Sequence, residues 1–250
     1  MINAIFVTRV FLVRLVMNPF DFPFDKFNFG SVSVLEGLSN EDNLLLNRNM
    51  TTHRYKKGEI LFREGSYPTG IYFVKKGKVK KYTTDKSGRE QIIYICQAGE
   101  LLGYHALIGQ EYFRDSASVI EDSIISFIPK EDFLLALSSS STLSNRLLKC
   151  LSHEFGVLTH TVSIFANKTV RERLALSLLI LRDKYKTDNI KGSPVELNLT
   201  REDLAKLVGT ARETLVRLLQ EFKQEGLVEI NGRKIILLKA NELSKIANLY

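Results

Sequence analysis

The stretch that decides the fold is residues 199–219, which read LTREDLAKLVGTARETLVRLL. Two short segments with the apolar spacing of amphipathic helices flank Gly209 in this run. Thr200 can cap the first segment, and Asp203 three residues later completes a start that resembles a capping box. Gly209 lies where a tight turn needs a left-handed residue. The spacing therefore predicts two helices joined by a turn.

The second of these helices has two chemically different faces. Its apolar face carries Leu215, Leu218 and Leu219, which we expect to be buried. An arginine can pair bidentately with guanine, and a carboxylate can accept a hydrogen bond from cytosine N4. The opposite face predicts a recognition helix in a DNA major groove; the alternative is a solvated helix pair with ordinary surface charges. The residues expected to contact bases are Arg212, Glu213 and Arg217.

The next segment, residues 222–237, reads FKQEGLVEINGRKIIL and predicts a β-hairpin. Asn231 and Gly232 between two apolar runs are a strong signal for a two-residue turn. Helix, turn, helix and hairpin together predict a winged helix. Arg233 and Lys234 lie beside the expected hairpin tip, where they either contact DNA phosphates or are simply charges on an exposed turn.

Composition sets the wider limits. The chain has 250 residues and a formal net charge of +7, which weakly favours a polyanionic partner. Its two cysteines, Cys96 and Cys150, cannot build a disulfide scaffold or a four-thiolate cluster, so we expect a reduced cytoplasmic protein. Met1–Val16 is apolar but interrupted by arginines, so we interpret it as a disordered extension or an artefact of start-site choice, with Met17 as the alternative start. No segment reaches the length of a membrane span.

Residues 51–129 have a different sequence pattern, in which short apolar runs alternate with glycine turns. Even spacing of this kind predicts an all-β barrel or roll. A lysine-rich run over residues 75–81 is interpreted as a solubilising edge strand rather than a contact with polymerase or nucleic acid. The expected strands are residues 60–62, 71–74, 79–83, 91–95 and 123–128.

Residues 130–166 predict a long helix with an apolar seam. The seam residues step by 3, 4, 3, 4 and 3 positions, which is the coiled-coil period and favours a homodimer. The alternative is a helix packed on its own β-roll. Residues 167–169 are expected to form a hinge, and Thr169 with Glu172 predicts a capping box that opens another helix. The seam consists of Leu148, Leu151, Phe155, Leu158, Val162 and Phe165.

These motifs resemble the Crp–Fnr family of bacterial transcription regulators. The resemblance is carried by RETLVR at 212–217, GEILFREG at 58–65 and YFVKKGKV at 72–79. It implies a cyclic-nucleotide-binding β-roll, dimerisation through the long helix, and base contacts by the second helix in a palindrome of TGTGA-like half-sites. It also implies that Thr200 and Arg201 bind phosphate and that RNA polymerase is a partner.

The same resemblance places an effector cassette at residues 103–117, GYHALIGQEYFRDSA. In the family a glycine amide and an arginine hold the cyclic phosphate, and a glutamate binds the ribose. Here Tyr104 occupies the glutamate position and Asp115 the arginine position, with Arg114 one residue away, so cyclic AMP is doubtful and another small effector is expected. The candidate pocket residues are Gly103, Tyr104, His105, Arg114, Asp115, Ser116 and Thr159.

Two alternatives remain open. Haem could be held by one of the histidines His105, His153 and His160, whereas the lack of a cysteine cluster argues against iron–sulfur sensing. The β-roll could also be a dimerisation scaffold that needs no ligand. An enzyme is not expected, because the sequence has no nucleophile–base pairing, no His-Glu-x-x-His zinc motif and no P-loop.

The sequence therefore predicts an α+β protein: a β-roll of the cyclic-nucleotide-binding type, a long dimerisation helix and a C-terminal winged helix-turn-helix. The expected divisions are an N-terminal extension that could be disordered (1–30), the effector β-roll (31–135), the dimerisation helix and hinge (136–167) and the DNA-binding domain (168–250). The expected function is sequence-specific regulation of transcription, as activator or repressor.

Overall fold

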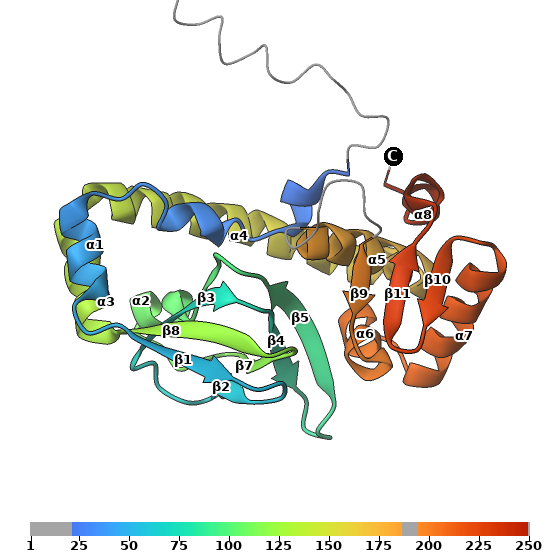
Figure 1. The fold of residues 1–250 in the computed structure, drawn as a ribbon, viewed down its shortest axis with the longest axis horizontal. Coiled ribbons are helices and arrows are strands. Elements are labelled where there is room, and N and C mark those ends of the chain that lie inside the picture. The colour runs from blue at the N-terminus through green and yellow to red at the C-terminus, as the bar shows by residue number, and fades with distance from the viewer. Residues whose placement is uncertain (1–21, 187–194, 250) are drawn as a thin grey trace, which may run out of the picture.

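The structure is a computed structural model, and it describes residues 22–186 and 195–249. The expectations for Met1–Val16 and for the polar connection at 187–194 lie outside the described residues. The chain forms a β-roll, a long helix that lies along it, and a C-terminal helical part with a small sheet (Figure 1). The fold is α+β, as the sequence predicts.

The β-roll consists of two antiparallel four-stranded sheets, in the orders β1-β8-β3-β6 and β2-β7-β4-β5. Val74, Val79 and Ile125 are almost fully buried where the inner faces of the two sheets meet. The five expected strands are present. The strands are β1 (Thr51–Tyr55), β2 (Ile60–Phe62), β3 (Gly70–Lys76), β4 (Val79–Thr84), β5 (Glu90–Cys96), β6 (Leu101–Leu102), β7 (Ser116–Val119) and β8 (Ser123–Pro129).

The lysine-rich run does not form an exposed edge. β4 is paired on both sides, with β5 and β7, and Lys78 is only 2% exposed. Lys78, just before β4, pairs with Glu121, and the two lysines of β4 pair with carboxylates as well: Lys80 with Glu90 and Asp203, and Lys81 with Asp115. The edge-strand interpretation is therefore wrong for β4, because long-range carboxylates compensate the buried charges.

Four helices surround the β-roll: α1 (Asn40–Asn47), α2 (Tyr104–Gly109), α3 (Lys130–Ser139) and α4 (Ser141–Asn167). The single helix expected over 130–166 is interrupted at Ser140, whose backbone is extended (φ −109°, ψ 104°). The Ser140 hydroxyl accepts a hydrogen bond from the N–H of Leu143 and so caps α4. Serine favours such caps over helix interiors, which explains the break.

Residues 22–30, which we call the strap, are part of the expected N-terminal extension, yet they pack against the protein. They include a short 3-10 helix (Phe24–Phe27), and a second one follows at Ser31–Val34. Phe22, Phe27 and Phe29 are 6–7% exposed. The strap crosses the far end of α4, and the chain then runs beside α4 towards α1 (Figure 1). Burial of the three rings favours this packing.

The C-terminal part begins at Thr169, whose side chain forms the predicted capping box with Glu172. Its core unites α5, α6 and α7 around residues such as Leu178, Leu215 and Phe222, all fully buried. The elements are α5 (Val170–Tyr185), β9 (Glu196–Asn198), α6 (Arg201–Val208), α7 (Arg212–Gln224), β10 (Val228–Asn231), β11 (Lys234–Leu237) and α8 (Ala240–Ile246).

The hairpin turn differs by one residue from the expected one. Asn231 pairs with Lys234, so the two-residue loop is Gly232 and Arg233. Gly232 has φ 58°, which fits a glycine at the first loop position of a hairpin turn. β11 also pairs with β9, which makes the wing a three-stranded sheet. The two parts of the molecule contact each other where α6 meets β5 (Figure 1).

Candidate functional site

The helix-turn-helix is held together by local capping. The Thr200 hydroxyl accepts a hydrogen bond from the N–H of Asp203 at 2.9 Å and caps α6. Gly209 ends α6 with φ 70°, and a Cβ added there would lie 2.6 Å from the ring of Phe165. Only glycine fits this turn, because the left-handed backbone would strain any other residue and a side chain would clash with the Phe165 ring. The turn thus fixes where α7 begins.

α7 buries one face and exposes the other. Leu215, Leu218, Leu219 and Phe222 are at most 5% exposed, whereas the three predicted base-contact residues are exposed. Arg212 and Glu213 lie in the first turn, where helix N-termini favour negative groups such as phosphate. The structure therefore brings Arg212, Glu213 and Arg217 to one open helix face.

The two arginines are in different surroundings. Arg217 forms an ion pair with Glu221 one turn later, and Glu221 also contacts Arg171 of α5 at 3.2 Å. Arg212 lines a cleft of about 680 Å³ between the start of α7 and the β4–β5 hairpin, with Glu90 among the other lining residues. A DNA groove that receives α7 would have to pass this hairpin, a constraint that the helix pattern alone does not reveal.

The predicted phosphate contacts divide into two kinds. The guanidinium of Arg201 donates hydrogen bonds to the carbonyls of Gly232 (2.9 Å) and Arg233 (3.2 Å), so it ties the wing to α6. Thr200 is engaged as the cap. Arg233 is exposed at the wing tip, and Lys234 pairs with Glu196 at 2.6 Å on the surface. Arg233 and Lys234 remain accessible to a polyanion.

The expected dimer seam is an exposed apolar strip on α4. Exposed fractions are 64% for Leu148, 73% for Phe155 and 70% for Val162, while Leu151 is half-buried. The opposite face of α4 packs on the β-roll and the strap through buried residues such as Leu147 and Val157. One face of α4 therefore packs internally, and the apolar strip lies on another, open face. The remaining seam residues, Leu158 and Phe165, are 41% and 40% exposed.

Phe165 has a second environment. Its ring lies beside Gly209 in the helix-turn-helix turn, and the Arg173 guanidinium lies 5.3 Å from the ring centre. Arg173 in turn donates to the carbonyls of Val208 and Gly209, at 2.9 and 3.1 Å. The last seam residue is therefore also a contact between α4 and the helix-turn-helix.

Two side chains of the effector cassette, Tyr104 and Asp115, are engaged with residues of other elements. Tyr104 is 2% exposed, and its hydroxyl donates a short hydrogen bond to the Glu154 carboxylate on α4. Burial raises the pKa of both groups. Asp115 forms an ion pair with Lys81 at 3.1 Å. Burial lowers the pKa of Lys81, but the combined attraction of Asp115 and other nearby acidic groups outweighs this effect and leaves the pKa above its ordinary value.

Other cassette residues are not brought together as expected. Arg114 is turned outward, with its side chain 80% exposed and paired with Glu111, so it does not take the place of a phosphate-binding arginine. Thr159 lies on the exposed side of α4 and donates to the carbonyl of Phe155. Gly103 forms the left-handed start of α2 (φ 84°), and the Ser116 hydroxyl accepts from the N–H of Glu64 at 2.9 Å.

The three histidines considered as haem ligands lie in separate surroundings. Burial and the nearby Lys81 lower the pKa of His105 to about 4, although Asp115 opposes this. His153 contacts the carbonyl of Asn28 at 2.9 Å, and the His160 ring lies 5.2 Å from that of Phe27. Within residues 22–186 and 195–249, no three His, Cys, Asp or Glu side chains are grouped to hold a metal ion.

Sequence reasoning missed the polar clamp between the two parts. Lys184 of α5 is 1% exposed and lies 3.3 Å from the Glu100 carboxylate, which is fully buried in the β-roll. Its ammonium also donates to the Tyr94 hydroxyl (2.8 Å) and the side-chain oxygen of Asn28 (2.9 Å). The only sequence signal for this cluster was a lysine among the apolar positions of α5.

A second bridge joins α6 to the β4–β5 hairpin. Lys80 contacts Asp203 at 2.9 Å, and Lys206 contacts Glu90 at 3.2 Å. The Gln91 side chain donates to the carbonyl of Lys206. Burial raises the pKa values of Asp203 and Glu90, but hydrogen bonds and charge from the lysines leave both below their ordinary values.

Comparisons with known proteins agree with this architecture. One family model, the cyclic nucleotide-binding domain, matches residues 52–140, and another, the Crp-like helix-turn-helix domain, matches residues 172–246. The chain is 27% identical to Electron transport regulator A of Shewanella oneidensis over 192 residues, which cover 77% of this chain and 76% of that protein. It is also 27% identical to the Fumarate and nitrate reduction regulatory protein of Vibrio cholerae over 194 residues, covering 78% and 77%.

Solved structures share the fold. A transcriptional regulator of the crp/fnr family from Eubacterium rectale has a TM-score of 0.68 at 23% identity, covering 84% of this chain and 95% of that one. The c-di-GMP responsive regulator CLP of Xanthomonas campestris has a TM-score of 0.66 at 24% identity, covering 80% and 99%. In the described ranges, no helix has the length and apolar character that crossing a bilayer requires. The chain belongs to the Crp–Fnr family of DNA-binding transcription regulators, which are not enzymes.

Proposed function

We propose that the chain acts as a homodimer that reads a palindrome of TGTGA-like half-sites. The observation that carries this proposal is the exposed face of α7, where Arg212, Glu213 and Arg217 lie together above a buried leucine face. A single helix of this size reads few bases, whereas two related by a twofold axis read two half-sites about one helical turn apart. The wing residues Arg233 and Lys234 would contact the phosphate backbone.

The exposed strip on α4 supports the dimer. A coiled-coil period of large apolar residues, several more than 60% exposed, is unfavourable in water unless a partner covers it. A second copy presents the same strip and is self-complementary. We propose residues 136–167 as the dimerisation element, between an effector β-roll at 31–135 and a DNA-binding unit at 168–250. RNA polymerase would be the partner downstream of DNA binding.

We also propose that the effector is not a cyclic nucleotide. In the cassette, Asp115 compensates the buried charge of Lys81, and Tyr104 is engaged with Glu154. A cyclic phosphate placed there would face the Asp115 carboxylate, and Arg114 points to solvent. Desolvating an anion without a free cationic partner is costly. A ligand-independent regulator is the competing possibility.

The test is fluorescence anisotropy at about 150 mM salt, because phosphate contacts make affinity depend on salt. The ligands are a palindromic TGTGA duplex and a scrambled duplex of the same composition. We expect the palindrome to bind at least tenfold more tightly, with no change when cyclic AMP is added. Equal binding to both duplexes would contradict base reading. Binding only with cyclic AMP would contradict our account of the cassette.

A further inference from the structure

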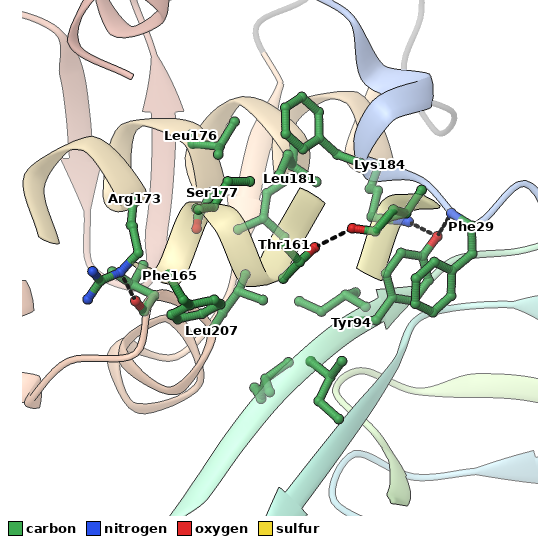
Figure 2. A pocket seen from close by; sticks show the side chains of 18 residues that line it. Phe29, Tyr94, Thr161, Phe165, Arg173, Leu176, Ser177, Leu181, Lys184 and Leu207 are labelled. Atoms are coloured by element: carbon green, nitrogen blue, oxygen red, sulfur yellow. Dashed lines mark hydrogen bonds between the residues drawn. The ribbon is translucent and has the colours of Figure 1, made fainter. Parts of the chain in front are cut away.

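An apolar cavity lies where the parts of the molecule meet, away from the cassette (Figure 2). Its volume is about 80 Å³. Its walls come from the strap, β5 of the β-roll, the second half of α4, α5, and α6 of the helix-turn-helix. In Figure 2, Thr161 and Leu181 lie between the aromatic ring of Phe165 on one side and those of Phe29 and Tyr94 on the other.

The chemistry of the lining selects an uncharged occupant. Most of the eighteen lining residues are aliphatic or aromatic. The two cations at its edge are already compensated: Lys184 by Glu100, and Arg173 by the carbonyls of Lys168, Val208 and Gly209. An ion entering the cavity would lose its hydration without gaining a new counter-charge. An apolar molecule, in contrast, would replace an empty or poorly hydrated space with close contacts.

The size of the cavity limits the occupant to a compact molecule. An engineered apolar cavity of about 150 Å³ takes up benzene or xenon, and a space of roughly 10–15 Å³ already holds one water. The present volume lies between these limits and suits a molecule of a few non-hydrogen atoms. Its eighteen lining residues include no histidine or cysteine, so they offer no axial ligand for haem.

We propose that this cavity is a binding site for a compact, uncharged, mainly apolar molecule. Occupation holds the helix-turn-helix in its observed docking on the β-roll. The walls belong to elements that must separate if the C-terminal part reorients: Ile92 and Tyr94 on β5, Phe165 at the end of α4, and Leu207 and Val208 on α6. Reorientation would dismantle the cavity, so a ligand that binds only the assembled form shifts the population towards it. The proposed effect on DNA binding rests on the proposed function, whereas the proposed binding of a ligand does not.

Binding is tested without DNA, using the full-length protein and xenon as the probe. The ¹²⁹Xe chemical shift is followed as protein is titrated in. Ser177→Leu fills the cavity from α5, and Ser177→Ala is the matched control that leaves it open. We expect a saturable shift for the wild type and Ser177→Ala and its loss in Ser177→Leu. Ile93→Phe, which fills the cavity from β5, should also remove the shift. Agreement between the two filling variants shows that the loss does not come from a folding defect in one of them. Equal shifts in filled and open variants would overturn the site.

Two further measurements test the ligand class and the coupling. Methyl acetate, which is uncharged, should displace xenon, whereas propionate, which has the same number of non-hydrogen atoms and a negative charge, should not; equal displacement would overturn the ligand class. Xenon saturation should change the affinity for the palindromic duplex at least threefold in the wild type and Ser177→Ala, and not in Ser177→Leu. Xenon binding with unchanged affinity would overturn the coupling. Loss of palindrome preference in all variants, with xenon binding intact, would overturn the proposed function alone.

Discussion

Replacing Lys184 with methionine should destabilise the protein strongly, because it leaves the buried carboxylate of Glu100 without its cation. Lys184 and Glu100 are 1% and 0% exposed, and the ammonium also donates to Tyr94 and Asn28 at 2.8 and 2.9 Å. Burial lowers the pKa of Lys184, which the Glu100 charge partly opposes. Removing one partner of a buried ion pair typically costs about 3–5 kcal/mol. With a urea dependence of about 3 kcal/mol per molar, the midpoint should fall by about 1–2 M.

The matched control is Lys186→Met, two residues further along. The Lys186 side chain is 45% exposed and pairs with Asp183 on the surface, so its loss should cost at most about 1 kcal/mol. Adding Glu100→Gln to Lys184→Met should recover at least half of the loss, because the orphaned charge disappears. Urea unfolding followed by far-UV circular dichroism measures all four proteins. Equal midpoints for Lys184→Met and Lys186→Met, or no recovery in the double variant, would refute the reasoning.

Arg212→Ala should cost about 1–3 kcal/mol on the palindromic duplex and relax specificity at one base pair, measured by anisotropy; an equal loss on scrambled DNA would contradict a base contact. Replacing Leu151 and Phe155 with glutamate should give monomers in sedimentation velocity, and a variant that stays dimeric would place the interface elsewhere. His105→Gln should flatten the pH dependence of stability between about pH 4 and 6.5. The pKa of His105 is lowered to about 4, so in that window the unfolded chain binds a proton that the folded protein does not. Stability should therefore rise with pH, by up to about 3 kcal/mol, in the wild type and not in the variant; parallel profiles would count against the buried neutral imidazole.

The features that could be predicted from sequence are those set by residues close together in the chain. The capping box of Thr169 and Glu172, the left-handed Gly209 and the alternating faces of α7 each depend on neighbours within one or two turns. Such local signals have a direct geometric cause. They located the helix-turn-helix, although the wing loop was displaced by one residue and Ser140 interrupted the expected helix.

The remaining features depend on partners that are distant in sequence. Lys80 pairs with Asp203 across 123 positions, and Lys184 bonds Asn28 across 156, so no local pattern announces either contact. For the same reason the sequence pattern predicted a solvated edge strand for the lysines of β4, which is a central strand. The Lys81–Asp115 ion pair also accounts for an aspartate where the family pattern has an arginine. The Asp115 carboxylate compensates the charge of a lysine on the neighbouring strand.

The strap has a consequence for biosynthesis. Its residues leave the ribosome early, but Lys184, which bonds Asn28, is added 156 positions later. At roughly 5–20 residues per second, about 8–30 s pass before that partner exists. During this interval the phenylalanine side chains of Phe22 and Phe27 lack the α5 surface that finally buries them. Nascent chains of this protein should therefore engage chaperones that bind exposed aromatic segments, and the strap should acquire protection from proteases only after α5 has been synthesised.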